Sequence, residues 1–360
     1  MLNPKIRSLG YSFITGITGE PCKNEFRGSL DDYRDRQSIK NLLLAIKHRI
    51  SQQENSFEDE TALITVFHLP YGGSLFRAPE LLGPGTLDKL KELIPQDPLH
   101  LPAALTLIDC ADEVFDGCAQ VLISETAFFV DLPPRERLDA LDLDLIKKMG
   151  IRHYGFNGTL HQAACRQVIS KRRLAGLDTY PKIASICLQS HPEVAAVIGR
   201  RPVMVTGGTT PLEGIPGNTT CGELDPGIVL TLVQKPGWGP EHINQVLTRE
   251  SGLKGLTGEQ TDLEAVFTRN KKNYRLAREI IRYRLLMACG AAKAAMGGLD
   301  TIAFSGKYVK LGEILGPWLI SNLVSGEGKN SKTTWEMFGR PPEKVIAEIA
   351  SAVAAACPVG

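Results

Sequence analysis

The chain has 360 residues, a formal net charge of +1 at pH 7, 43% hydrophobic residues and 22% charged residues. This length exceeds a usual single domain, so we expect two lobes with large apolar cores. A net charge so close to zero argues against binding to nucleic acid or to an anionic membrane by bulk electrostatics.

Two further absences in the sequence narrow the class of protein. No apolar run approaches the roughly 20 residues that a membrane helix needs, and no secretion signal is visible, so we expect a cytoplasmic protein. The 8 cysteines contain no C-x-x-C pair and no Cys/His cluster at zinc spacing. We therefore interpret them as reduced core residues.

The first part of the chain alternates short strands with helices. Ser38 is expected to cap the first helix, because apolar residues then recur at the helical period through Ile50. The further elements predicted before residue 151 are a strand at 63–67, a helix from Pro102, a strand at 121–124 and a helix that ends at Gly150.

The second part continues this alternation. Thr261 and Glu264 have the spacing of a capping box, which predicts a helix start at Thr261. The other predicted elements are a helix at 161–171, a strand at 183–188, a hairpin of 194–198 and 202–205 around Gly199, and helices from Pro226, at 274–296 and at 341–356, with a strand at 301–304. Between them, residues 206–225 form a long loop without periodicity, and loops of this kind are often functional. The pattern predicts an α/β fold with sheets covered by helices.

Three segments then resemble the acetate kinase family. Residues 153–161 are similar to that family's R-Y-G-F-H-G-T-S-H, and residues 250–258 to its E-S-G-L-L-G-x-S-G. Residues 210–214 and 221–226 are similar to T-P-L-E-G and R-C-G-D-I-D-P. Weaker similarities, in the same order, lie at 68–73, 98–103 and 125–128.

The resemblance implies a fold, an assembly and an activity. The fold is the two-lobed α/β fold of acetate and sugar kinases, Hsp70 and actin, which is ribonuclease H-like and has a cleft between the lobes. We expect residues 1–150, with a C-terminal helix at about 341–360, to form the N-terminal lobe. Residues 151–340 would form the C-terminal lobe, with the nucleotide side and the contacts of a homodimer. The activity is transfer of the γ-phosphoryl group of ATP, with Mg²⁺, to a short-chain carboxylate.

Most of the family's phosphoryl-binding residues are replaced. Two arginines, two histidines and an acidic residue surround this group in the family. The arginines correspond to His68 and Thr220, the histidines to His100 and Asn157, and the aspartate to Glu125. Only His100 keeps the family's residue. An Arg→Thr change loses the charge, and losing one such contact costs about 10²–10³ in rate.

The nucleotide side is altered as well. The family's H-L-G-N-G-S-S loop corresponds to residues 187–193, where Ser190 and His191 replace an asparagine and a glycine, and a proline and a glutamate are new. A glutamate beside a triphosphate is repulsive, and proline removes a backbone donor. The adenosine-side turn keeps Gly306, followed by Lys307, and Asp262 is in place. The family's metal-binding glutamate segment is not recognisable, so the metal ligands are unknown.

Three hypotheses remain open. The first is an acyl kinase of weak or altered activity, which uses Mg²⁺ and ATP and acts on a small carboxylate. The second is a catalytically inactive pseudokinase that serves as a binding or regulatory module and needs no cofactor. The third is different chemistry on a small anion in the same cleft.

Overall fold

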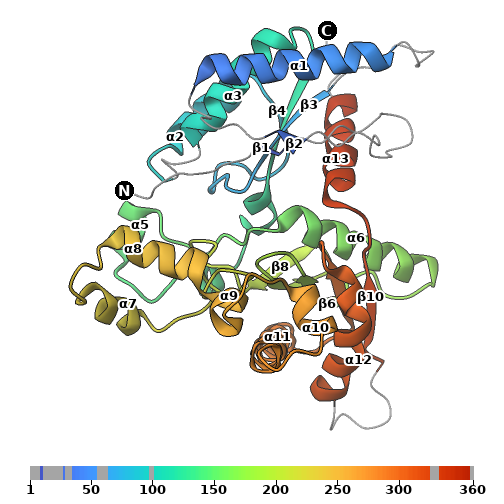
Figure 1. Ribbon diagram of the computed structural model, residues 1–360. Helices are drawn as coiled ribbons and strands as arrows, with labels where there is room; N and C mark the ends of the chain where they lie inside the picture. The colour runs from blue at the N-terminus through green and yellow to red at the C-terminus, as the bar shows by residue number, and fades with distance from the viewer. Residues whose placement is uncertain are drawn as a thin grey trace. The chain divides into compact units, whose positions relative to one another are not determined.

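The computed structural model describes residues 9–10, 27–28, 35–54, 64–96, 101–324 and 332–356. The chain divides into a larger unit, Phe128–Pro342, and a smaller unit, Leu2–Ala127 with Glu343–Gly360 (Figure 1). The boundary therefore lies near residue 128, whereas the sequence analysis placed it near 150. Residues after 128 join the larger unit through contacts such as the bond from Val205 N–H to the Glu136 carboxylate, at 2.8 Å.

The smaller unit contains a three-stranded sheet in the order β3-β5-β4. Strands β3 (Ile64–Leu69) and β5 (Ala119–Ser124) are parallel, and β4 (Glu80–Leu81) is antiparallel to β5. Both parallel strands were predicted from their apolar residues. The short strands β1 (Leu9–Gly10) and β2 (Arg27–Gly28) pair separately.

Helices cover both faces of this sheet. Successive strand residues point to opposite faces, so Leu122 joins a core with helices α1 (Arg36–Glu54) and α3 (Leu101–Val114), while Val121 and Ile123 pack against α13 (Pro342–Ala356). Helix α2 (Pro84–Glu92) adds to the first layer. Segments more than 200 residues apart in the sequence thus share one core.

The prediction that Ser38 caps the first helix is wrong. Helix α1 begins at Arg36, and the Asp35 carboxylate accepts hydrogen bonds from Gln37 N–H at 3.2 Å and Ser38 N–H at 3.0 Å. Asp35 is therefore the cap, and a hydrogen bond from the Ser38 hydroxyl, together with these two backbone bonds, lowers the pKa of its carboxyl. Ser38 lies inside the first turn.

The larger unit contains a five-stranded sheet in the order β10-β9-β6-β7-β8. Strands β10 (Thr334–Met337), β9 (Thr301–Ser305) and β6 (Lys182–Cys187) are parallel. Strands β7 (Glu193–Ile198) and β8 (Arg201–Val205) form the predicted hairpin, in which Gly199 has a φ of 59°. A positive φ at this turn suits glycine.

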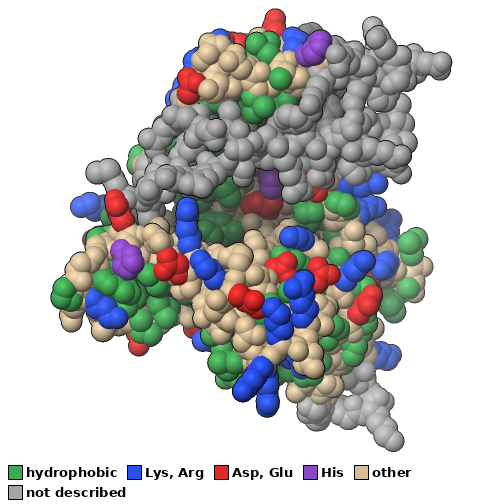
Figure 2. All heavy atoms as spheres, viewed as in Figure 1, with side chains coloured by type: hydrophobic (Ala, Val, Ile, Leu, Met, Phe, Trp, Pro, Cys, Tyr) green, Lys and Arg blue, Asp and Glu red, His purple; other side chains and the backbone are tan. Residues whose placement is uncertain are grey.

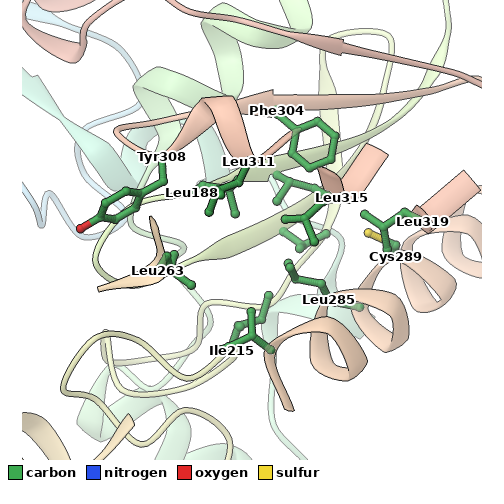
Figure 3. Close-up of a cluster of buried hydrophobic side chains, with 14 of the residues drawn as sticks. Leu188, Ile215, Leu263, Leu285, Cys289, Phe304, Tyr308, Leu311, Leu315 and Leu319 are labelled. Atoms are coloured by element: carbon green, nitrogen blue, oxygen red, sulfur yellow. The ribbon is translucent and has the colours of Figure 1, made fainter. Parts of the chain in front are cut away.

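Two long helices lie against this sheet. Helix α6 (Gly158–Leu174) packs on β6 and β9, and α11 (Tyr274–Met296) packs on β6, β7 and β8. Ala184 and Ile186 of β6 join the core that contains α11 and α12 (Gly312–Leu323), shown in Figure 3, whereas Ser185 between them bonds to α6. The alternation places one polar side chain of a buried strand beneath the start of α6.

Shorter helices complete the larger unit. They are α4 (Pro134–Arg137), α5 (Leu143–Met149), α7 (Pro226–Val233), α8 (Pro240–Gln245), α9 (Gly252–Thr257) and α10 (Leu263–Thr268), with the single turns η2 (Val246–Glu250) and η3 (Val309–Leu311). The single turn η1 (Glu125–Phe129) begins in the smaller unit and ends in the larger one. Gly150 ends α5 with a φ of 65°, as predicted. The cap of α10 is Asp262 rather than Thr261, because Asp262 accepts the Ala265 N–H at 2.9 Å.

The predicted long loop at 206–225 contains no helix or strand. Backbone hydrogen bonds nevertheless fix it at both ends, from Tyr154 N–H to Gly208 at 3.0 Å and from Glu223 N–H to Gly214 at 2.7 Å. In its middle, Asn218 N–H donates to Ser190 at 2.6 Å. Within the described ranges, no helix combines the length and apolarity that crossing a membrane requires.

Candidate functional site

In the smaller unit, the carboxyl ends of β3 and β5 bring two predicted site residues together. His68 pairs in register with Ile123, and Glu125 follows β5 directly. The His68 Nε2 and Glu125 Oε1 atoms are 2.6 Å apart. The imidazole is 35% exposed and the carboxylate 11%. A histidine held by a carboxylate is the arrangement that orients a general base or nucleophile.

The loop after His68 closes tightly over the end of β5. Gly72 N–H donates to Thr126 Oγ1 at 3.0 Å, and Thr126 Oγ1 also lies 3.0 Å from Ser124 Oγ. A Cβ atom at Gly72 would lie 2.2 Å from Ser124 Oγ, so this position needs glycine. These contacts fix the backbone on both sides of Glu125.

In the larger unit, a buried carboxylate lies beside the start of α6. Glu193 is 1% exposed and begins β7. Its carboxylate accepts hydrogen bonds from Phe156 N–H at 2.8 Å, from Asn157 N–H at 3.1 Å and from His161 Nε2 at 3.2 Å. The two backbone donors directly precede α6, which begins at Gly158, and the dipole at this end of the helix also favours negative charge. The protein's own side chain thus satisfies these donors.

The partners of His161 fix its orientation. Its Nδ1 lies 2.8 Å from Ser185 Oγ of β6, and the ring is fully buried. A carboxylate accepts hydrogen bonds, so we assign the ring proton to Nε2, which faces Glu193. The Nδ1 atom then accepts a hydrogen bond from the Ser185 hydroxyl. The chain from β6 through His161 to Glu193 therefore holds residues 156 and 157 in place. Asn157 is the N-cap residue of α6, but its side chain makes no capping hydrogen bond.

His191 bridges two loops. Its Nδ1 is 2.8 Å from Thr220 Oγ1, and its Nε2 is 2.9 Å from the carbonyl oxygen of Glu213. A carbonyl can only accept, so Nε2 carries the proton and Nδ1 accepts from the Thr220 hydroxyl. Burial lowers the pKa of His191, which agrees with a neutral ring. One predicted nucleotide-binding residue and one predicted catalytic residue thus bind each other.

Close backbone packing explains the glycine of the adenosine-side turn. Gly306 has a φ of 93°, and a Cβ atom there would lie 2.6 Å from the carbonyl oxygen of Leu188. The turn is joined to residues 188–189 by Tyr308 N–H, which donates to Leu188 at 3.0 Å, and by Lys307 N–H, which lies 3.4 Å from Gln189 Oε1. Gly306 and Lys307 are therefore neighbours of the loop that carries Ser190 and His191.

The remaining predicted residues lie apart from these contacts. The Asp262 carboxylate caps α10, which accounts for its presence without a ligand. His100 falls outside the residues that the structure describes. The described residues contain no group of three or more His, Cys, Asp or Glu side chains that could hold a metal ion.

Sequence reasoning missed the central role of Glu193. It treated this residue only as a repulsive acid beside a phosphate. A usable signal was present, because a glutamate at the start of an otherwise apolar strand must find donors when it is buried. Its partners could not be named, since Phe156 and Asn157 are more than 30 residues earlier in the chain.

Removing the Glu193 carboxylate tests its role. In Glu193→Ala, two backbone N–H groups and the His161 ring would lose their acceptor in a buried site. Each unsatisfied donor costs about 1–3 kcal/mol, so we expect roughly 3 kcal/mol or more of lost unfolding free energy. Urea denaturation measures this. The control Glu279→Ala removes an exposed carboxylate from a pair with Arg275 and should change stability by less than about 0.5 kcal/mol. Equal losses of unfolding free energy in Glu193→Ala and Glu279→Ala would contradict the role assigned to the Glu193 carboxylate.

The burial of His191 predicts a pH dependence of stability. Its folded pKa is below the ordinary value of 6.5, so the unfolded chain binds more protons once the pH falls below 6.5. Stability should therefore be present above 6.5 and be lost as the pH falls toward the folded pKa. Burial raises the pKa values of Glu136 and Glu213, whose contribution has the opposite sign.

Urea unfolding from about pH 7.5 to about 5.5 should thus show a smaller loss in His191→Gln than in the unmodified protein. His242→Gln, at an exposed histidine of α8, is the control and should keep the original dependence. The same pH dependence in all three proteins would mean that His191 does not contribute.

Comparison with known proteins identifies the family of this chain. The chain matches the Acetokinase family over residues 20–313. An acetate kinase from Thermosipho africanus is 32% identical over 313 residues, which cover 85% of this chain and 76% of the relative. One from Syntrophobacter fumaroxidans is 32% identical over 239 residues, covering 66% of this chain but only 57% of the relative, less than two thirds of its length.

Solved structures agree on the fold. The crystal structure of Porphyromonas gingivalis acetate kinase superposes with a TM-score of 0.80 at 24% identity, covering 98% of both chains. A propionate kinase from Francisella tularensis gives a TM-score of 0.76 at 23% identity, covering 90% of this chain and 86% of that one. The predicted α/β fold of the acetate kinases is confirmed, and the chain belongs to the Acetokinase family.

Proposed function

We propose that this protein is a carboxylate phosphotransferase, which moves the γ-phosphoryl group of ATP to a short-chain carboxylate with weak or altered activity. The observation that carries the proposal is the His68–Glu125 pair, 2.6 Å apart at the carboxyl ends of two parallel strands. Polar residues replace the family's arginine and aspartate there, so a group able to contact a phosphoryl oxygen remains. Family membership supplies the reaction class.

His68 would act in this reaction as a hydrogen-bond donor. When its ring is protonated, Glu125 holds Nε2 and leaves the second N–H free to meet a phosphoryl oxygen. Phosphoryl transfer depends mainly on positioning and on such electrostatic contacts. An imidazolium offers one directed donor where arginine offers a bidentate fork, which explains why we propose weaker activity.

The proposed cofactors are ATP and Mg²⁺. Among the described residues no carboxylate cluster could hold the metal without a ligand, so the ion would arrive with the nucleotide phosphates, as is usual for Mg²⁺. We therefore derive no step through the metal. The nucleotide would lie beside the loop with Ser190 and His191 and the turn with Gly306 and Lys307.

A second candidate, a pseudokinase, is favoured by the larger unit. The Glu193 carboxylate accepts hydrogen bonds from the two backbone N–H groups just before α6. Both ring nitrogens of His191 are hydrogen-bonded, one to Thr220 and the other to Glu213. Groups that could otherwise meet a triphosphate are occupied by the protein itself. In this case the protein would be a binding or regulatory module without turnover. Chemistry on another small anion, the third hypothesis, has no observation that favours it.

Calorimetry and a coupled assay separate the two candidates. For a phosphotransferase we expect Mg·ATP and Mg·ADP to bind at micromolar concentrations, with acyl phosphate formation from ATP and acetate or propionate. His68→Ala should lower this rate by about 10²–10³, whereas His242→Gln should not. No heat at millimolar nucleotide, with the protein shown to be folded by circular dichroism, would favour the pseudokinase.

We also propose that the protein is a homodimer, as the family resemblance implies. Helix α7 supports this, because Ile228, Leu230 and Val233 are 45%, 66% and 52% exposed and no residue of the helix is buried. Apolar side chains gather at this end of the larger unit (Figure 2). A helix so apolar is expected to be covered by a partner.

Light scattering during size-exclusion chromatography should therefore give twice the chain mass of 39.3 kDa. Leu230→Glu, which places a charge on the exposed side of α7, should shift the population toward the monomer, since desolvating an unpaired charge disfavours association. Thr231→Glu, at an exposed polar position of the same helix, is the control. A monomeric mass for the unmodified protein would contradict the proposal.

A further inference from the structure

The His68–Glu125 pair has a feature that the proposed kinase reaction leaves unused. Glu125 Oε1 lies 2.6 Å from Nε2, so in the neutral ring the proton is held on Nε2. The Nδ1 atom then carries a free lone pair. No hydrogen bond to Nδ1 is found among the residues that the structure describes, and the side chain is 35% exposed. This is a nucleophilic nitrogen oriented by a carboxylate.

The chemistry of a carboxylate acceptor narrows what this nitrogen could do. A carboxylate is already ionised at neutral pH, so a general base has no proton to remove from it. In its neutral form the ring can instead contribute as a nucleophile. Histidine is one of the side chains that form covalent intermediates, whereas the arginine that the family resemblance implies at this position cannot.

We propose that His68 Nδ1 accepts a phosphoryl group from an acyl phosphate, which makes a phosphohistidine on the smaller unit. The Nδ1 lone pair attacks phosphorus and forms the N–P bond. The P–O bond to the acyl group breaks, and its electron pair leaves with the carboxylate ion. The ring becomes positively charged while it keeps the Nε2 proton, and the Glu125 carboxylate stabilises that charge. No oxidant, reductant or further reactant is needed.

This reaction needs no nucleotide and therefore goes beyond the proposed function. Both groups lie in the smaller unit, in a segment fixed by the Gly72–Thr126 and Ser124–Thr126 contacts. The substrate class is an activated phosphoryl donor with a good leaving group, because imidazole is a moderate nucleophile. Glu125 is a positioning residue here, since it acts through the imidazole.

The contrast with His161 shows why the site is His68. His161 also contacts a glutamate and lies 3.2 Å from Glu193, but its ring is fully buried and Ser185 holds its Nδ1. It has neither a free nitrogen nor access to a substrate. His191 likewise uses both ring nitrogens. A phosphoryl donor should therefore react with His68 and not with His161 or His191.

The test is labelling of the full-length folded protein with ³²P-acetyl phosphate in the absence of nucleotide. We expect a protein-bound label that is stable to alkali and lost in acid, and that maps to the peptide containing His68. His68→Asn should abolish it, and the control His242→Gln should not change it. Label in heat-denatured protein at the same level, or label on another residue, would overturn the proposal.

Two further variants separate the nucleophile from other roles. His68→Arg restores a positive donor but has no nucleophilic nitrogen, so it should lose the label even if it raises any kinase turnover. Glu125→Gln should slow labelling by roughly 10-fold or more, while Glu125→Asp, which keeps the carboxylate, should recover much of the rate. Equal labelling rates in Gln and Asp variants of equal melting temperature would remove Glu125 from the mechanism.

Kinase turnover is measured on the same preparations, so the two proposals can fail independently. Turnover from ATP without label would overturn the phosphohistidine and leave the phosphotransferase. Label without turnover would support the phosphohistidine in a protein that has lost its use of ATP. A label that is lost in alkali as well as in acid would place the phosphoryl group on a carboxylate and would overturn His68 as the acceptor.

Discussion

The larger unit depends on where the Glu193 carboxylate finds its donors. It lies at the start of β7, 1% exposed, and receives two backbone N–H groups from the beginning of α6 and one from the His161 ring. Residue 207 needs to be glycine, because a Cβ atom at this position would lie 2.3 Å from Glu193 Oε2. A buried charge in an apolar strand is costly without partners, so these elements must meet in one arrangement. Helix α6, the hairpin and the long loop are therefore fixed together.

Two histidine–glutamate pairs among the described residues illustrate how burial decides a role. The His161–Glu193 pair is 0% and 1% exposed and has a hydrogen-bond partner on each side, which makes it part of the scaffold. The His68–Glu125 pair is 35% and 11% exposed at the end of a sheet, where a substrate could reach the ring. The same residue types thus give a buried core contact in one unit and a partly exposed pair in the other.

Residues that replace the family's ligand-binding residues form hydrogen bonds within the protein. The sequence difference at residues 187–193 suggested lost phosphate binding, and in the structure His191 and Glu193 form internal hydrogen bonds there. Thr220, in the position that the resemblance assigns to an arginine, is the partner of His191. Positions that could serve a ligand in a family member therefore stabilise the protein itself, which is the physical basis for proposing weak or lost nucleotide chemistry.

Much of the fold follows from local sequence. Apolar runs predicted β3, β5, β6 and β9, the helical period predicted α11 over Tyr274–Met296, and glycines predicted the end of α5 and the turn of the hairpin. These features depend on contacts within a few residues. Competition between neighbouring polar residues was less predictable, so Asp35 and Asp262 cap helices that were expected to begin at Ser38 and Thr261.

The candidate site was predicted as a set of residue types and not as a set of contacts. The pairing of His68 with Glu125 joins residues 57 apart, and that of His191 with Thr220 joins residues 29 apart. Such distances close only when strands align in register and loops pack, which no local pattern encodes. The sequence by itself determined many of the strands and helices and which family the chain resembles. Only the tertiary structure decided which polar groups satisfy each other, because that depends on burial and on the donors that the fold brings within reach.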